Sequence, residues 1–318
     1  MGTTRSRPLD LPPLPLEPWE ATKQTLHLLL QIVGKTRLSL HPKLNHWWHV
    51  PLYVSPRGLS TRTIPTEQGA LEVVFDLHDH VLRIETSDGE RKGFALPGLA
   101  VADFYRQYFA ALAELGLNVR IIARPYDNPS TIPFAEDREH RAYDPEAVHR
   151  YWRVLSSINT VFEEFRGRFL GKATPVHLFW HSFDLAYTRF SGEAAPLSGG
   201  TKADAEAYSH ALISFGFWPG DATVREAAFY SYTYPEPAGL NEEPLVPGSA
   251  QWVEKGVSHL AFYPYASMRA AADPHRALHD FLESAYVAGA SRANWPVAAL
   301  AHGPTVDTGG MSTTSPGT

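Results

Sequence analysis

The chain has 318 residues, a formal net charge of -6 at pH 7 and no cysteine. Because basic residues are not in excess, nucleic acid and anionic membranes are disfavoured as partners. The lack of cysteine excludes disulfides, thiolate nucleophiles and iron-sulfur clusters, so any metal ligands would have to be His, Asp, Glu or Tyr.

The first half of the chain shows alternating signals of helix and strand. Residues 1–17 are proline-rich and lack the apolar stretch of a secretory signal, so we expect a disordered leader and a cytoplasmic protein. After a helical run, Trp47 to Val54 alternates with a period of two, which predicts a strand. Two more alternating runs and the Asp88-Gly89 turn predict an antiparallel meander. A second helical run completes a first α+β half over 18–125.

The second half repeats this order after an irregular segment. Residues 126–143 are rich in Pro, Asp and Glu, which is typical of a linker or covering loop. Asp144-Pro145 is a helix start and opens the longest helical run, and Asp273-Pro274 opens the last helix. An apolar strand over 176–190, a short helix over 203–210 and further strands then build a second α+β half over 144–300. The composition of 301–318 predicts a disordered tail.

Both halves run from a helix through antiparallel strands to a second helix, and Trp48 to Tyr53 resembles Val176 to Trp180 in position. This order predicts an α+β fold of antiparallel sheets with flanking helices. It also predicts an internal duplication of a helix-meander-helix unit, for which a chance recurrence of common elements is the alternative. We expect one compact body, as a monomer or a homodimer.

Several long and unusual runs resemble a bacterial family known as domain of unknown function 5996. The resemblance spans nearly the whole chain. It implies no activity, ligand or catalytic residue. The runs that carry it are LNHWWHVPLYV from Leu44, FDLAYTRFSG from Phe183, EAYSH from Glu206, FWPG from Phe217 and FYSYTYPEP from Phe229.

Two histidines are candidate metal ligands. His177 and His181 lie four residues apart in a predicted strand, where such positions share a face. Together with Glu206 and His210 they form the predicted ligand set for a divalent Fe, Cu, Zn or Mn ion. The alternative is that each histidine bonds a backbone carbonyl, and a bulge at Ser182 would separate the two rings.

Three residues are candidate catalytic groups. Glu206 and His210 stand at i and i+4 of a predicted short helix, so their side chains would touch. Such a pair suits a metal site or a carboxylate-oriented general base, but an ordinary exposed helix pair would look the same. His49, beside Trp47 and Tyr53 on the predicted strand, would be an acid or base in an aromatic pocket, unless that strand is packed core.

Substrate contacts are predicted for Trp47 and Tyr53 of this pocket and for three further side chains. Arg57 and Arg189 follow corresponding strands of the two halves and could clamp an anion, with internal salt bridges as the favoured alternative. Tyr232 belongs to a row of phenols along one strand face, which suits ligand contact or a cross-strand ladder equally well.

The leading hypothesis from these residues is a small-molecule enzyme. Its pocket would be lined by His, Glu and aromatic side chains, with a mononuclear metal centre as an option. The class of reaction stays open. The alternative is a non-catalytic protein that binds an aromatic or haem-like ligand.

Overall fold

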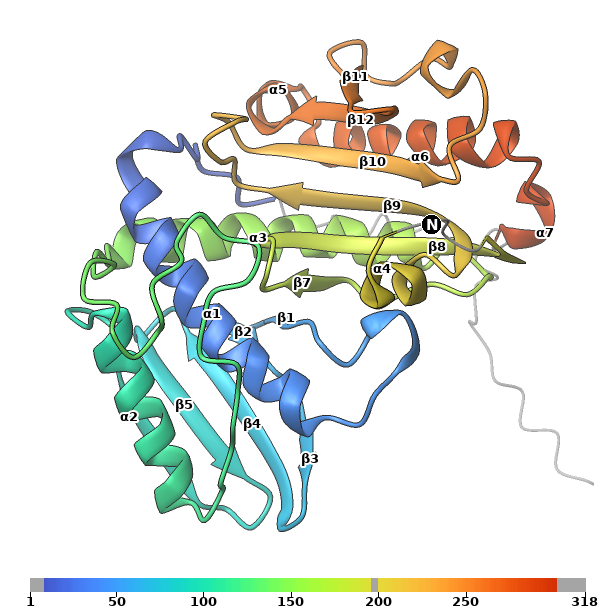
Figure 1. Ribbon diagram of the computed structural model, residues 1–318. Helices are drawn as coiled ribbons and strands as arrows, with labels where there is room; N and C mark the ends of the chain where they lie inside the picture. The colour runs from blue at the N-terminus through green and yellow to red at the C-terminus, as the bar shows by residue number, and fades with distance from the viewer. Residues whose placement is uncertain (1–8, 196–199, 302–318) are drawn as a thin grey trace, which may run out of the picture.

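The computed structural model of the chain describes residues 9–195 and 200–301 (Figure 1). Most of the predicted tail and residues 1–8 of the predicted leader lie outside this part. The rest of the leader is folded, which corrects the expected disorder there. Leu14 and Leu16 are both buried in the core, because their side chains gain more from leaving water than the short segment loses in freedom.

The first half holds one sheet with a helix at each end of its sequence. Its strands pair antiparallel in the order β1-β2-β4-β5-β6, and β3 also pairs with β4. Apolar residues such as Val73 and Ile84 alternate with polar ones, so one face is buried beneath helices. Its elements are η1 (Glu17–Trp19), α1 (Glu20–Leu40), η2 (Asn45–Trp47), β1 (Tyr53–Ser55), β2 (Gly58–Ser60), β3 (Ile64–Thr66), β4 (Gly69–Asp76), β5 (Val81–Thr86), β6 (Arg91–Ala95) and α2 (Val101–Glu114).

The second half holds a larger antiparallel sheet in the order β11-β12-β10-β9-β8-β7. Its two long helices start as expected, because the Asp144 and Asp273 carboxylates cap the first amides of α3 and α6. The elements are α3 (Pro145–Arg166), β7 (His177–Phe179), β8 (Asp184–Ala194), α4 (Lys202–Ala207), β9 (His210–Trp218), β10 (Ala228–Tyr234), η3 (Leu240–Glu242), β11 (Gln251–Lys255), β12 (Ser258–Pro264), α5 (Tyr265–Ala270), α6 (Pro274–Arg292) and α7 (Val297–Leu300).

The two sheets meet at the bridge between Leu52 and Leu178. The Leu52 amide donates to the Leu178 carbonyl over 2.9 Å, and the Leu178 amide donates to the Leu52 carbonyl over 2.7 Å. Nearby, Trp180 packs so closely on Gly34 of α1 that a Cβ there would lie 2.2 Å from the indole. The halves therefore share one hydrophobic core. The bridged segments are the two that look alike in sequence, and the duplication itself stays a prediction.

The two faces of the large sheet differ. One face carries Tyr187, Phe215 and Phe229, all buried, and α3 and α6 lie together behind it in Figure 1. The other face carries Tyr230 and Tyr232, which are only half-buried, and α4 lies in front of one end of it (Figure 1). A ligand can therefore approach the sheet from this second face.

The predicted α+β class, with antiparallel sheets and flanking helices, is confirmed. Some predicted elements are wrong. Trp47 to Val54 does not form one strand, because His46 and Trp47 adopt φ values of 51° and 60°, which turn the chain into η2 and leave only β1 extended. The helix predicted over 203–210 ends early, and His210 instead begins β9.

Candidate functional site

Four segments that are distant in the sequence meet beside α4, at one end of the large sheet. His46 of η2 lies at their centre and is 6% exposed. Its ring centroid is 4.4 Å from that of Phe190 in β8, 5.6 Å from that of Trp48 and 5.4 Å from that of His210 in β9. We call Lys172, His46 and His210 the lysine-histidine cluster.

The hydrogen bonds of His46 determine which ring nitrogen carries its proton. Nδ1 lies 3.2 Å from the Ala207 carbonyl oxygen, which can only accept, so this nitrogen donates. Nε2 lies 2.8 Å from Nζ of Lys172 and accepts from the ammonium. Burial, together with the nearby charge of Lys172, lowers the pKa of His46. The ring is therefore a neutral imidazole whose basic nitrogen faces an amine.

Lys172 lies in the connection between α3 and β7 and is half-buried. Its ammonium is 5.5 Å from the Trp48 ring centroid and 5.3 Å from that of Phe190. Among the described residues no carboxylate forms an ion pair with it. Burial lowers its pKa, because an ammonium loses hydration that His46 and two rings replace only in part. This is the environment that turns a lysine into a nucleophile or base at moderate pH.

Two predicted residues, Trp47 and Glu206, attach α4 to η2 above the cluster. The Trp47 indole nitrogen donates to the Ala203 carbonyl over 3.0 Å. The Glu206 carboxylate lies 2.7 Å from the Lys43 ammonium, so it does not form the expected pair with His210. His210, the third predicted member, reaches the cluster from β9. The structure thus brings Trp47, Glu206 and His210 into one region, although their contacts differ from those predicted.

The second predicted pocket lies on the other side of Trp47. The His49 ring stacks on Trp47 at 5.5 Å between centroids, and its Nδ1 accepts from the Leu44 amide over 3.2 Å. Burial lowers the pKa of His49. Tyr53 is buried, and the Arg62 guanidinium carbon lies 3.7 Å from the centroid of its ring. These side chains are packed together, and neither contacts the lysine-histidine cluster directly.

The predicted pair His177 and His181 does not share a strand face. The run predicted as one strand is a hairpin, since β7 ends at Phe179 and the chain turns before β8. His177 is fully buried, neither ring nitrogen has a partner among the described residues, and burial lowers its pKa to about 3. His181 lies in the turn, with Nδ1 3.8 Å from the Asp127 carboxylate.

The remaining predicted substrate contacts lie elsewhere. The Arg57 guanidinium donates to Asp76 and, over 2.7 Å, to Asp79. Arg189 is on the helix-covered face of the large sheet, where it donates to the Phe165 carbonyl over 2.7 Å. Tyr232 is on the open face, and its hydroxyl lies 3.1 Å from that of Tyr208, which follows α4.

Within the described ranges, no group of three or more His, Cys, Asp or Glu side chains is arranged to hold a metal ion. The four predicted ligands lie in β7, in the turn after β7, in α4 and at the start of β9. Their convergence required a continuous strand and a longer helix. Neither element forms, so the predicted ligand set does not assemble.

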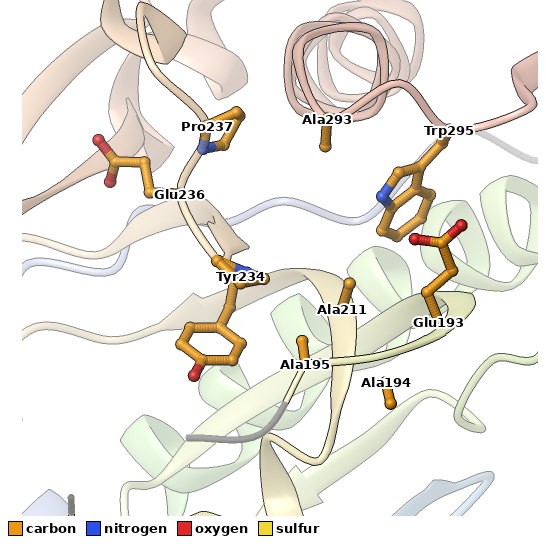
Figure 2. Close-up of a pocket in the computed structure, with 10 residues that line it drawn as sticks. Glu193, Ala194, Ala195, Ala211, Tyr234, Glu236, Pro237, Ala293 and Trp295 are labelled. Carbon is orange, nitrogen blue, oxygen red and sulfur yellow. The ribbon is translucent and has the colours of Figure 1, made fainter. Parts of the chain in front are cut away.

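A cavity of about 470 Å³ lies beside β9 (Figure 2). Ala211 faces the cavity, whereas its neighbour His210 faces the cluster, as expected for successive residues of a strand. The cavity has two acidic and two aromatic lining residues and no basic one. The lining consists of Glu193, Ala194, Ala195, Ala211, Tyr234, Pro235, Glu236, Pro237, Ala293 and Trp295.

One family model matches nearly the whole chain. The model of a family described as "Family of unknown function (DUF5996)" matches residues 11–302. The chain belongs to this family. No curated protein and no solved structure matches the chain. Among the described residues of this DUF5996 member, no helix is long and apolar enough to cross a membrane.

Sequence reasoning did not single out Lys172, His46 or Trp48 as site residues in this DUF5996 chain. Lys172 and His46 are 126 positions apart, and no periodic signal links them. One signal was available: His46 and Trp48 belong to the same LNHWWH run as Trp47 and His49. Its alternation was interpreted as a strand, although its paired aromatic and imidazole groups suit a turn that presents side chains to several neighbours.

Proposed function

We propose that the protein is a small-molecule enzyme that uses Lys172 as an amine nucleophile toward a carbonyl compound. The observation that supports this most is the 2.8 Å contact between Lys172 Nζ and Nε2 of a histidine that is held neutral. A lysine whose only close polar partner is a base can lose its proton to that partner. A lysine paired with a carboxylate would instead be kept charged.

The proposed step needs no further reagent. The Lys172 ammonium gives a proton to His46 Nε2, and the amine lone pair attacks the carbonyl carbon. A C–N bond forms while the carbonyl π electrons move to oxygen, which takes the proton back from His46. The nitrogen, still protonated, gives a proton to His46, which passes it to the hydroxyl; the lone pair freed on nitrogen then forms the C=N bond as water leaves. Ammonium and carbonyl compound thus yield a protonated imine and water.

The surroundings favour an aromatic or apolar carbonyl compound. Trp48 and Phe190 flank the ammonium at 5.5 and 5.3 Å, so an apolar substituent can pack on their rings. Helix α4 is held in place by the hydrogen bond from Trp47, and it limits the access of water to Lys172 from one side. His210, next to His46, can exchange protons with the departing water.

Borohydride trapping tests the proposal. The protein is incubated with benzaldehyde or glyoxylate and reduced, and the adduct is located by peptide mass mapping. We expect one dominant adduct, on Lys172, that is lost in Lys172→Arg and retained in the exposed-lysine control Lys255→Arg. His46→Gln should slow trapping roughly 100-fold, as the loss of a general base typically does. Equal labelling of the Lys172→Arg variant would overturn the proposal.

A metal centre is the second candidate, because the His46 and His210 rings lie 5.4 Å apart. A metal on His46 Nε2 would have to displace Lys172. Elemental analysis and an absorbance spectrum of protein purified without chelator would decide this. Near-stoichiometric Fe, Cu, Zn or Mn that is lost in His46→Ala or His210→Ala would support a metalloenzyme. An absorbance band without metal would favour the binding of an aromatic or haem-like ligand.

A further inference from the structure

We propose that the cavity beside β9 is a separate binding site for a small organic ammonium ion. This proposal does not rest on Lys172 chemistry, because the cavity and the lysine-histidine cluster are on opposite sides of the strand. It rests on the charge of the cavity, on its aromatic wall and on an indole N–H that makes no hydrogen bond with a described residue.

The charge of the cavity is negative. The Glu193 carboxylate forms no ion pair or hydrogen bond with a described residue, whereas Glu236 is engaged by the His259 amide and by His259 Nδ1 over 2.6 and 2.7 Å. Figure 2 shows Glu236 pointing away from the cavity and Glu193 beside the ring of Trp295. Arg292 of α6 is occupied by Glu243 over 2.5 Å and is not part of the lining.

The end of α6 adds to this negative field. The helix spans 19 residues and ends at Arg292, and its C-cap residue, Ala293, lines the cavity. The carbonyl end of a helix carries a partial negative charge that stabilises a cation within the last turn. The Glu193 carboxylate, which has no partner among the described residues, and the C-terminus of α6 therefore act in the same direction.

The aromatic wall selects an organic cation over a metal ion. Trp295 is 7% exposed, and its indole nitrogen has no hydrogen-bond partner among the described residues. Figure 2 shows this nitrogen edge turned toward the space between Ala293 and Ala211. A Trp ring attracts alkylammonium groups through its face, and the indole N–H suits an oxygen acceptor near the charged nitrogen. An amino alcohol or a related ammonium compound has both features.

Choline and its uncharged carbon isostere, 3,3-dimethylbutan-1-ol, make a matched pair of probes. In a ligand-observed NMR titration of the full chain, we expect choline to bind and the isostere to bind at least tenfold more weakly. Glu193→Gln should weaken choline binding about fivefold, as expected for the loss of one partly exposed ion pair. Trp295→Phe should keep a ring but remove the donor, and weaken binding about threefold.

The control variant is Glu254→Gln, which removes an exposed carboxylate from β11, outside the cavity lining. It should leave the affinity for choline unchanged. Circular dichroism and thermal melting of each variant separate a lost site from a lost fold. Equal affinity for choline and the isostere would overturn the proposal. So would an unchanged affinity in Glu193→Gln, or no binding at the highest choline concentration that leaves the protein folded.

Discussion

The two faces of the large sheet each hold one cation that lacks a carboxylate partner among the described residues. Arg189 lies on the helix-covered face and is 2% exposed. It donates to the Phe165 carbonyl and, over 3.3 Å, to the Tyr187 hydroxyl. Its guanidinium carbon is 3.7 Å from the Phe165 ring centroid and 4.3 Å from that of Tyr286. Lys172 lies on the other face and contacts His46.

Arg189 and Lys172 differ in the groups that they contact. A carbonyl, rings and a phenol whose pKa is raised by burial do not titrate near neutral pH, so Arg189 has no way to exchange a proton. Its role is to fill and fix the core. Lys172 faces a neutral imidazole and is accessible from solvent, so its proton can move. A buried cation therefore indicates chemistry only where its partner can accept a proton.

The largest effect should come from Arg189. In Arg189→Met the Phe165 carbonyl and the Tyr187 hydroxyl lose their donor inside the core, and the stacking on the rings is lost. At roughly 1 to 3 kcal/mol for each unpaired buried group, we expect a loss of about 4 kcal/mol in the free energy of unfolding. Urea titrations measure it. Arg106→Met, at an exposed i,i+3 ion pair, should cost under about 1 kcal/mol. Similar losses of unfolding free energy in both variants would contradict the structural role assigned to Arg189.

The sequence predicted the parts of the fold that local rules govern. Asp144-Pro145 and Asp273-Pro274 start long helices because capping and proline geometry act within one turn. The rule of alternation failed at Trp47 to Val54, since a tertiary bridge from Leu52 to Leu178 and two left-handed residues decide that segment.

The site was predictable only in part, for the same reason. Trp47, Glu206 and His210 were chosen for their chemistry, and they do lie near one another. The contact on which the proposed amine chemistry depends joins Lys172 to His46 across 126 positions. No local pattern links Lys172 to His46, because the pairing depends on how η2 docks against the α3–β7 connection.

A second prediction concerns His279, a neutral histidine on the same face as Arg189. It is 6% exposed, and burial lowers its pKa to about 4 from an ordinary value of 6.5. Between these two values only the unfolded chain binds the proton, so stability is full above pH 6.5 and falls as the pH drops toward 4. At about 1.4 kcal/mol per pH unit, this residue alone should cost about 3 kcal/mol at pH 4.

His279→Leu tests this sign directly. The variant should match the wild-type free energy of unfolding at pH 7 within about 1 kcal/mol, because Nε2 of His279 has no partner among the described residues to lose. At pH 4 it should be the more stable protein by about 3 kcal/mol. Denaturant titrations at both pH values give the difference. A variant that loses stability in parallel with the wild type would show that His279 is not held neutral.

The smallest effect should come from Glu206, and it separates a docking role from a catalytic one. The Lys43 partner of Glu206 is 64% exposed, so Glu206→Gln should cost at most about 1 kcal/mol and change the trapping rate of Lys172 less than about threefold. Lys43→Met should have the same effect, and the double variant should add nothing, because both changes remove one contact. A trapping rate that falls roughly 100-fold in Glu206→Gln but not in Lys43→Met would instead make Glu206 a proton-transfer group. The open face would then hold a carboxylate that acts on the amine chemistry without touching Lys172 in the resting structure.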